Sequence, residues 1–392
     1  MNRAGLFHLG LKYLAGNRGK TLLLVFAFTL VWLLPSAIAM LVGKVETHLR
    51  SRAMVTPLVL GSAGSDLELT FNALHFTKPN IATLTYRDAL DVSASGLGDS
   101  IPLYARFTAS DHRIVGTTID YLRFRKFNYE QGRAFLRMGE CVVGSAVATE
   151  NGISVGDAIV SSPETLFDLA GVYPLRMTVA GILQPTGSPD DDAIFVDLKT
   201  TWIIEGLGHG HRNAEDTPET ERLSTGSDGV VRLNASVLEY NEVTPETIDS
   251  FHFHGEQEDN PITAAIVIPN GTKEQALLKG RYASSKTLEL VTPAEEINEL
   301  FATVFSIQKV VIWMLVLVGI ATLALGALTF ILSYRLRDRE FVSLRHIGAS
   351  PGMLRGLIAF EGAFVLVSSL ALSGAMLIVV DWIAPILIQR FW

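Results

Sequence analysis

Three long apolar runs, separated by polar sequence, dominate the pattern of hydrophobic and polar positions along the chain. They lie at residues 21–43, 310–332 and 357–380, and the first contains no charged residue. Because about 20 apolar residues cross a bilayer as a helix, each run predicts a transmembrane helix. The first run exceeds the apolar core of a secretory signal peptide and shows no small-residue cleavage site, so we expect it to be retained.

The sequence between the first two runs has a different pattern, with short β-rich stretches separated by turn residues. Examples are residues 176–183 and 193–198, and a short helix is expected over residues 85–93. This pattern predicts a mixed α/β domain over residues 44–292. Within it, residues 205–229 are polar and rich in glycine, which predicts a flexible surface loop.

At Pro293 the pattern becomes helical, because two acidic residues follow the proline and apolar residues then recur on one face. We expect a stalk helix over residues 293–309 that continues into the second transmembrane helix. The rest of the chain consists of three segments outside the membrane helices. These are an amphipathic N-terminal segment at 1–20, a polar segment at 333–356 and a C-terminal tail at 381–392.

Composition and charge orient this arrangement. The chain is 48% hydrophobic and only 18% charged, which is too apolar for an ordinary soluble protein. Basic residues concentrate in segments 1–20 and 333–356, which places both in the cytoplasm and the α/β domain outside. With three transmembrane helices the C-terminus would also lie outside. The single cysteine, Cys141, excludes an intramolecular disulfide, so the domain must depend on its hydrophobic core.

The segment over residues 333–356 alternates charged and apolar side chains and ends in the turn Gly-Ala-Ser-Pro-Gly. Phe341, Val342, Leu344 and Ile347 form an apolar stripe behind a charged face. One interpretation is a simple determinant of membrane topology. The other is a short helix on which a soluble partner docks.

The same segment resembles the signature of FtsX/MacB/LolC-type permeases, also called type VII ABC transporters. The matching positions are Arg339, Glu340, Leu344, Arg345, Gly348, Ala349, Ser350, Glu361 and Gly362. The resemblance implies that residues 339–350 form a coupling helix that contacts a separate ATPase. Glu361 lies inside the third apolar run, where an acid is costly, and we expect it to pair with Arg355.

The α/β region also resembles the periplasmic domain of this family. Matching stretches are Gly132 with Arg133, and residues 142–145, 155–157 and 179–183. The order of the parts agrees as well. Members of the family typically have four transmembrane helices, whereas this sequence predicts three, and residues 381–392 are too short to form another.

The resemblance implies a permease subunit in the cell inner membrane, with the large domain in the periplasm. Its partners would be an ABC ATPase of the LolD or MacB type and a second permease, either identical or related. The complex would export or extract a lipid, lipoprotein or peptide, or assist zinc transport with a periplasmic adaptor or metal-binding protein. Alternatively, the chain would be an FtsX-like mechanotransmitter that transports nothing and regulates a periplasmic partner. Neither interpretation involves nucleic acid.

The chain shows no ATPase motif of its own. Residues 16–21, GNRGKT, resemble the end of a phosphate-binding loop, but the required first glycine is Leu14. Sequence spacing supports no hydrolase triad either. We therefore expect no enzymatic activity and no bound cofactor apart from a metal ion, with ATP used by the partner subunit.

Four histidines form two His-x-His pairs, His209 with His211 and His252 with His254. In an extended segment residues i and i+2 point to the same side, so each pair offers two imidazoles to one ion. Imidazole is a preferred ligand of Zn²⁺, and the acids at 256, 258 and 259 are candidate oxygen ligands. The alternative is that these are polar loop histidines without a ligand.

Overall fold

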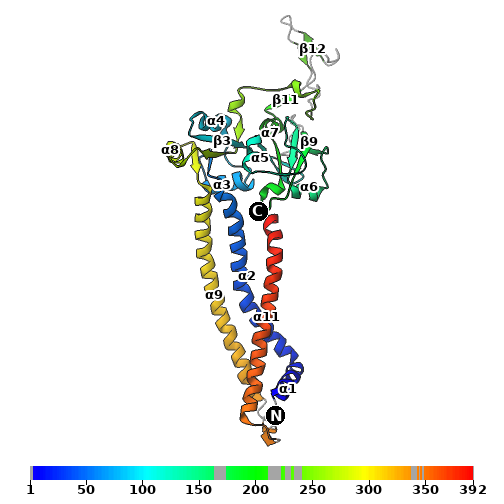
Figure 1. Ribbon diagram of the computed structural model, residues 1–392, viewed down its shortest axis with the longest axis vertical. Helices are drawn as coiled ribbons and strands as arrows, with labels where there is room; N and C mark the ends of the chain where they lie inside the picture. Colours follow the sequence, from blue (N-terminus) through cyan, green and yellow to red (C-terminus); the bar gives the residue numbers. More distant parts are fainter. Residues whose placement is uncertain are drawn as a thin grey trace. The chain divides into compact units, whose positions relative to one another are not determined.

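The computed structural model describes residues 3–162, 174–210, 222–225, 231–233, 241–336, 342–343, 345–346 and 348–391. The chain divides into two compact units. A helical unit contains Met1–His48 and Glu299–Phe391, and an α/β unit contains Leu49–Asn298. Figure 1 labels their helices and strands.

Four helices of the helical unit have described bounds: α1 (Arg3–Gly16), the first part of α2 (Arg18–Met54), most of α9 (Pro293–Leu336) and α11 (Pro351–Phe391). Three of them are long and apolar enough to cross a membrane, with mean hydropathies of 2.4 to 2.6. The three predicted transmembrane helices are therefore confirmed. Each helix is longer than its apolar run, because the flanking residues continue the helical hydrogen bonding. In α11 the helix includes residues that the sequence assigned to a tail from residue 381.

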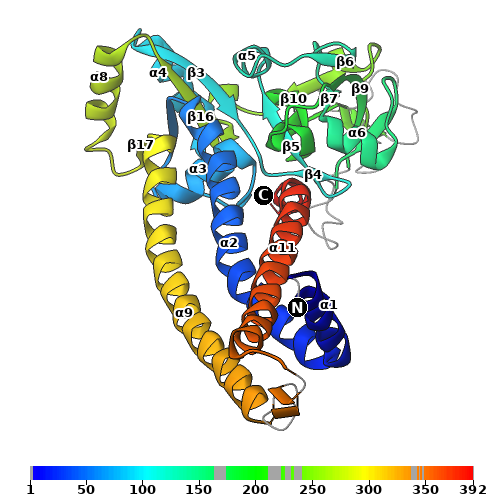
Figure 2. The same cartoon turned by 60° about the horizontal axis from the view of Figure 1, so that its bottom comes forward.

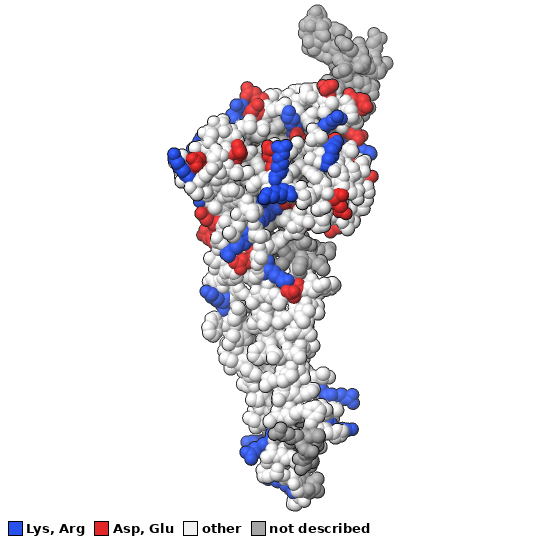
Figure 3. All heavy atoms as spheres, in the orientation of Figure 1, with Lys and Arg blue, Asp and Glu red and all other residues white. Residues whose placement is uncertain are grey.

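The three membrane helices pack together through a small apolar cluster. Leu24 and Phe28 of α2 and Val365 of α11 are buried there, and Phe330 of α9 packs against them. Gly326 of α9 allows the close approach, since a Cβ atom at this position would lie 2.6 Å from the Phe28 ring. Outside this cluster most of the apolar side chains are exposed, and Figure 3 shows a long surface of these helices without charged residues. Such a surface fits a lipid environment.

The described part of the α/β unit contains two large sheets and three two-stranded ones. The first is a four-stranded antiparallel sheet in the order β17-β1-β16-β3. Its strands are β17 (Leu288–Val291), β1 (Leu58–Ser62), β16 (Ala264–Pro269) and β3 (Gly98–Leu103). The helices that contact it are α3 (Asp66–His75), α4 (Tyr86–Ala94) and α8 (Thr272–Tyr282). A short pair, β2 (Leu84–Thr85) with β15 (Pro261–Ile262), precedes α4 and β16.

The second sheet has seven strands of mixed direction, in the order β4-β5-β10-β7-β9-β6, with β8 also paired to β9 (Figure 2). Its strands are β4 (Thr108–Ala109), β5 (His112–Thr117), β6 (Tyr129–Gly132), β7 (Glu140–Val143), β8 (Ala158–Val160), β9 (Arg176–Leu183) and β10 (Ala193–Asp197). Helices α5 (Ile119–Phe124) and α6 (Ser145–Asn151) lie between these strands in the sequence, and α7 (Leu198–Ile204) directly follows β10. Strand β5 is parallel to β10, and β7 is parallel to β9.

One hydrophobic core joins the two sheets. Leu58 and Val267 of the first sheet belong to the same buried cluster as Ile114 and Val143 of the second. The fully buried Cys141 is part of that cluster, and burial raises the pKa of its thiol well above the ordinary value. The predicted mixed α/β domain is therefore confirmed, and it is held by packing as the single cysteine requires.

The region that the sequence predicts as a flexible loop, residues 205–229, contains two described strands. They are β11 (Gly208–Gly210) and β12 (Arg222–Thr225). Strand β11 pairs with β14 (Phe251–Phe253), and β12 pairs with β13 (Val231–Leu233). The loop prediction for residues 211–221 and 226–229 lies outside the described residues. Strand β11 forms because it pairs with β14, which lies far away in the sequence, and local composition does not predict that pairing.

Candidate functional site

The turn at residues 348–351, which follows the predicted coupling segment, is fixed by local interactions. Gly348 has a φ of +94°, a conformation that only glycine adopts at low cost, and its N–H donates to the carbonyl of Arg345. Ser350 then accepts hydrogen bonds from the N–H of Met353, as a helix cap does, and Pro351 occupies the first position of α11. The turn therefore ends one segment and begins the next helix sharply.

The other predicted coupling residues divide into two groups. Arg345 is exposed and Ala349 is half-buried, so the arginine is accessible to a partner. Arg339, Glu340 and Leu344 lie outside the described residues, as do Phe341 and Ile347 of the predicted apolar stripe.

Helix α1 packs against the first turns of α11, directly after this turn. The Phe7 and Phe360 rings meet edge to face with their centroids 5.3 Å apart. Gly10 provides the space, because a Cβ atom there would lie 2.4 Å from the Phe360 ring. Leu354 and Leu357 are buried against Leu9 of α1. The N-terminal helix thus supports the start of α11.

Glu361 is buried in the helical unit and forms an ion pair with Lys20 of α2, with 2.6 Å between the carboxylate and the ammonium group. The sequence analysis expected Arg355 as its partner, from proximity along one helix. The structure instead joins two membrane helices through this pair. An acid in such a position is costly unless it is paired, which explains the contact.

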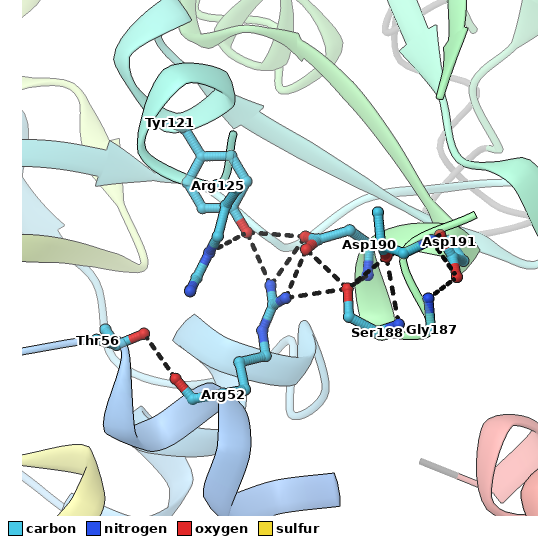
Figure 4. A network of polar contacts seen from close by, with 9 residues as sticks. Arg52, Thr56, Tyr121, Arg125, Gly187, Ser188, Asp190 and Asp191 are labelled. Atoms are coloured by element: carbon cyan, nitrogen blue, oxygen red, sulfur yellow. Dashed lines mark hydrogen bonds and ion pairs between the residues drawn. The ribbon is translucent and has the colours of Figure 1, made fainter. Parts of the chain in front are cut away.

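A buried polar network, referred to below as the Arg52 cluster, lies at the periplasmic end of α2 (Figure 4). It consists of Arg52, Tyr121, Arg125, Ser188 and Asp190. The Arg52 guanidinium donates to both oxygens of Asp190, at 2.5 and 2.8 Å, and to the Tyr121 hydroxyl at 2.8 Å. That hydroxyl in turn donates to Asp190 at 2.9 Å, as does Ser188. Arg52 is 6% exposed and Asp190 only 2%.

The electrostatics of the Arg52 cluster follow from its burial. Burial alone would raise the pKa of Asp190, but the charge and hydrogen bonds of Arg52 outweigh it and hold that pKa below its ordinary value. Burial raises the pKa of Tyr121 to about 12, so the phenol stays protonated and can donate. The cluster therefore consists of the buried Arg52–Asp190 pair, the neutral donors Tyr121 and Ser188, and a second cation, Arg125, whose charge also lowers the pKa of Asp190.

Sequence reasoning missed this cluster. The sequence presents Asp190 within an acidic run, Asp190 to Asp192, that is typical of a solvated turn. The structure shows instead that Asp190 and Asp191 are buried, with Asp191 accepting from the N–H groups of Thr186 and Gly187. The available signal was Arg52 itself, a basic residue just beyond the external end of an apolar run.

The strands that connect the α/β unit to the membrane helices are neighbours. Strand β1 follows α2, β17 precedes α9, and the two pair antiparallel, with Val59 opposite Val291 and Leu60 opposite Leu290. Asp190 lies in the short 3-10 helix Pro189–Asp192 that leads directly into β10, so its ion pair with Arg52 connects the end of α2 to the second sheet as well. The last turn of α2 is thus bound to both sheets.

Three of the four predicted metal-ligating histidines converge. The candidate ligand atoms of His209, His252 and His254 all lie within 4.8 Å of one another. The grouping differs from the sequence prediction, which paired His209 with its near neighbour His211. The structure pairs His209 with His252 across two strands, and His211 lies outside the described residues.

Comparison with known proteins identifies the α/β unit. Residues 33–238, just over half of the chain, match the family model of the MacB-like periplasmic core domain. No curated protein matches the chain.

Three solved structures are similar to this chain at low sequence identity and low TM-score. The periplasmic region of MacB from Actinobacillus actinomycetemcomitans is 10% identical, with a TM-score of 0.33 over 63% of this chain and 92% of that one. The extracellular domain of the noncanonic ABC-type transporter YknZ from Gram-positive bacteria is 13% identical, with a TM-score of 0.32 over 60% of this chain and 98% of that one. A domain of a permease protein from Porphyromonas gingivalis is also 13% identical, with a TM-score of 0.28 over 61% and 91%.

Proposed function

Because the chain belongs to the MacB/FtsX-like family of type VII ABC transporter permeases, we propose that it converts ATP hydrolysis by a separate ATPase into movement of its periplasmic domain. The observation that carries the proposal is the MacB-like core domain on a chain with three candidate membrane helices. The movement acts on a lipid, lipoprotein or peptide substrate, which the complex exports or extracts.

The connections of the α/β unit support this role. Both membrane helices that flank the unit in sequence lead to hydrogen-bonded neighbours, β1 and β17. The buried Arg52–Asp190 pair holds the end of α2 against the second sheet. A displacement of α2 therefore has a stiff route to both sheets, since breaking the route means separating buried opposite charges.

We place the ATPase contact on the cytoplasmic segment at residues 333–356. Its described part offers the exposed Arg345, followed by a turn that is fixed by Gly348 and Ser350. An exposed cation next to a rigid turn suits recognition of a folded partner. In this proposal the chain itself catalyses no reaction, and ATP is bound and hydrolysed by the partner.

The test is co-purification with ABC ATPases of the same organism from detergent extracts, followed by the ATPase activity of the recovered complex. Reversing one charge with Arg345→Glu should reduce recovery of the ATPase at least tenfold. Lys12→Glu is the matched control, because Lys12 is also exposed and cytoplasmic but lies on α1. Its complex should form normally.

Two results would contradict the proposal. One is the absence of any ATPase in the wild-type extract. The other is equal loss of the ATPase in both variants, which would indicate a general effect of positive charge on membrane insertion. ATP hydrolysis by the purified chain alone would overturn the assignment of catalysis to the partner.

A further inference from the structure

We propose that His209, His252 and His254 form an exchangeable Zn²⁺ site on the periplasmic domain, referred to below as the histidine face. The inference rests on the geometry of strands β11 and β14 and does not depend on the proposed function. It stands even if the chain couples to no ATPase.

The pairing of the two strands creates the histidine face. His209 of β11 is the direct antiparallel partner of His252 of β14, and the two ring centroids lie 4.7 Å apart. His254 follows two residues after His252, so it lies on the same side. Its ring is 5.0 Å from that of His209 and 5.2 Å from that of His252. The three rings therefore surround one point.

The opposite side of the same strand pair is apolar and closely packed. Gly208 faces Phe253, and Gly210 faces Phe251, with room for no side chain at either glycine. A Cβ atom would lie 2.5 Å from the Phe253 ring and 2.6 Å from the Phe251 ring. The sequence Gly-His-Gly thus packs against Phe-His-Phe. The two phenylalanine rings lie on one face of the strand pair, and the imidazoles lie on the other.

This apolar side fixes the histidine face to the core. Phe253 contacts the ring of Trp202 edge to face, and Trp202 is 1% exposed. The indole N–H of Trp202 donates to the carbonyl of Pro261 at 2.9 Å. The N–H of His254 also donates to the carbonyl of Leu207 at 3.4 Å, which holds the residue beside β11. The three histidines are consequently held on a supported backbone.

Hydrogen bonding prepares one imidazole for a metal. The Nδ1 atom of His252 lies 3.2 Å from the carbonyl oxygen of Ser250, which can only accept, so this nitrogen carries the proton. The lone pair is then on Nε2. Metal-binding histidines generally have such a bond from the second ring nitrogen to a carbonyl or carboxylate.

The ligand set selects the ion. Three neutral nitrogen atoms suit a borderline cation such as Zn²⁺ and are poor ligands for Ca²⁺ or Mg²⁺, which prefer oxygen. Of the acids considered in the sequence analysis, Glu256 and Asp259 pair with Arg87, at 2.5 and 2.9 Å. Zinc with nitrogen at about 2.0–2.1 Å needs the ligand atoms somewhat closer than 4.8 Å, which small side-chain rotations provide.

The described residues supply three protein ligands, one fewer than a closed tetrahedral site has, and His254 is exposed. A structural zinc site is normally closed by four protein ligands, whereas an open site exchanges its ion or binds another ligand. The histidine face therefore suits reversible zinc binding from the periplasm. Bound zinc would connect strand β11 to strand β14 across the 40 residues that separate Gly210 from Phe251 in the sequence.

The experiment uses the full chain in detergent, purified without a histidine tag and stripped with a chelator. Zinc affinity is measured by competition with a chromophoric chelator, and Co²⁺ serves as a spectroscopic probe. We expect one Zn²⁺ per chain and visible Co²⁺ absorption bands of tetrahedral coordination. His209→Ala and His252→Ala should each lower zinc affinity at least tenfold, and the double variant should lose binding.

His8→Ala is the matched control, since His8 is exposed but lies on α1. Its affinity should equal that of the wild type. Thermal unfolding of each metal-free variant separates loss of ligands from misfolding. Binding that survives the double variant, or a wild type that binds no zinc, would overturn the proposal. Recovery of the ATPase is measured on the same preparations. A chain that recovers the ATPase but binds no zinc would contradict the zinc site alone and leave the proposed function standing.

Discussion

The Arg52 cluster and the histidine face are both polar constellations on the α/β unit, but they differ in every property that determines function. In the Arg52 cluster, a cation and an anion are both buried and satisfy each other. In the histidine face, three neutral bases lie together, half-buried or exposed, and leave one point between them.

The difference shows what separates a structural polar site from a binding site. A buried pair of opposite charges has no capacity left for a ligand, and removing one member leaves the other unpaired in a low-dielectric environment. The three imidazoles of the histidine face instead bring their candidate ligand atoms together around one point, as the ligands of a metal ion do. The first arrangement stabilises the fold, and the second is suited to binding an ion.

The largest expected effect concerns the Arg52 cluster. Asp190→Asn leaves the Arg52 guanidinium buried without its counter-charge and should cost about 3–5 kcal/mol of stability. For a domain of this size we expect the unfolding temperature to fall by about 10 °C. Thermal unfolding of the purified chain, followed by tryptophan fluorescence, measures the change.

The control for this variant is Asp120→Asn, which removes an exposed ion pair with Arg123 at 3.3 Å. Exposed pairs contribute about 0–1 kcal/mol, so the unfolding temperature should hardly change. If both variants lowered the unfolding temperature equally, the buried Arg52–Asp190 pair would contribute no more to stability than an exposed ion pair.

Zinc should stabilise the histidine face by the second largest amount. A ligand that binds only the folded state at 100 times its Kd adds about 2.7 kcal/mol of stability. The unfolding temperature should therefore rise with zinc concentration in the wild type but not in the His209→Ala/His252→Ala variant. A rise in both proteins would place the zinc elsewhere.

A smaller effect is expected from the apolar side of the same strands. Gly208→Ala introduces a methyl group against the Phe253 ring, which must shift and carry its strand with it. We expect zinc affinity to fall about tenfold, equivalent to about 1.4 kcal/mol, although all three histidines remain. Gly280→Ala is the control, because a Cβ atom at this position of α8 would meet no neighbouring atom. Its zinc affinity should equal that of the wild type. Unchanged affinity in Gly208→Ala would mean that the apolar side does not position the histidines.

The smallest effect concerns an exposed counterpart of the Arg52–Asp190 pair. Arg133 donates to both oxygens of Glu140 at 2.8 Å, and these hydrogen bonds lower the pKa of Glu140. Because the Arg133 side chain is 52% exposed, Glu140→Gln should cost only about 1 kcal/mol.

The pH dependence of that cost follows from the lowered pKa. The wild type should be more stable than Glu140→Gln above the ordinary carboxyl range, and the difference should vanish as the pH falls through the folded-state pKa of Glu140. Unfolding of both proteins between pH 7 and pH 3 tests this. A difference that grows in acid would contradict the assignment.

The membrane helices and the α/β class could be predicted from the sequence because each depends on local pattern. An uncharged run such as residues 21–43 has the same meaning wherever it occurs, and the period-2 pattern of residues 176–183 predicts the strand β9. The turn at Gly348 to Ser350 is similarly local, since its residues satisfy the φ angle and the cap of the turn itself.

The contacts between distant residues could not be predicted in this way. The acidic run that contains Asp190 is typical of a solvated turn, and the partner that makes Asp190 buried instead, Arg52, lies 138 positions away. Glu361 was matched to Arg355 on its own helix, whereas the structure gives it Lys20. His209 meets His252 only because β11 pairs with β14. In each case residue type indicated a special role, but the partner depended on the tertiary fold.

The pairing of β1 with β17 also has a consequence for the time at which β1 can fold during synthesis. Strand β1 ends at Ser62, yet both of its neighbours, β16 and β17, are formed by residues after Thr263. The ribosome must therefore make nearly the whole domain before its first strand can pair with anything. Until then the exposed edges of β1 are free to pair wrongly. The second sheet, whose strands all lie within residues 108–197, can form earlier, whereas the first sheet is completed only when the chain has been made as far as Val291.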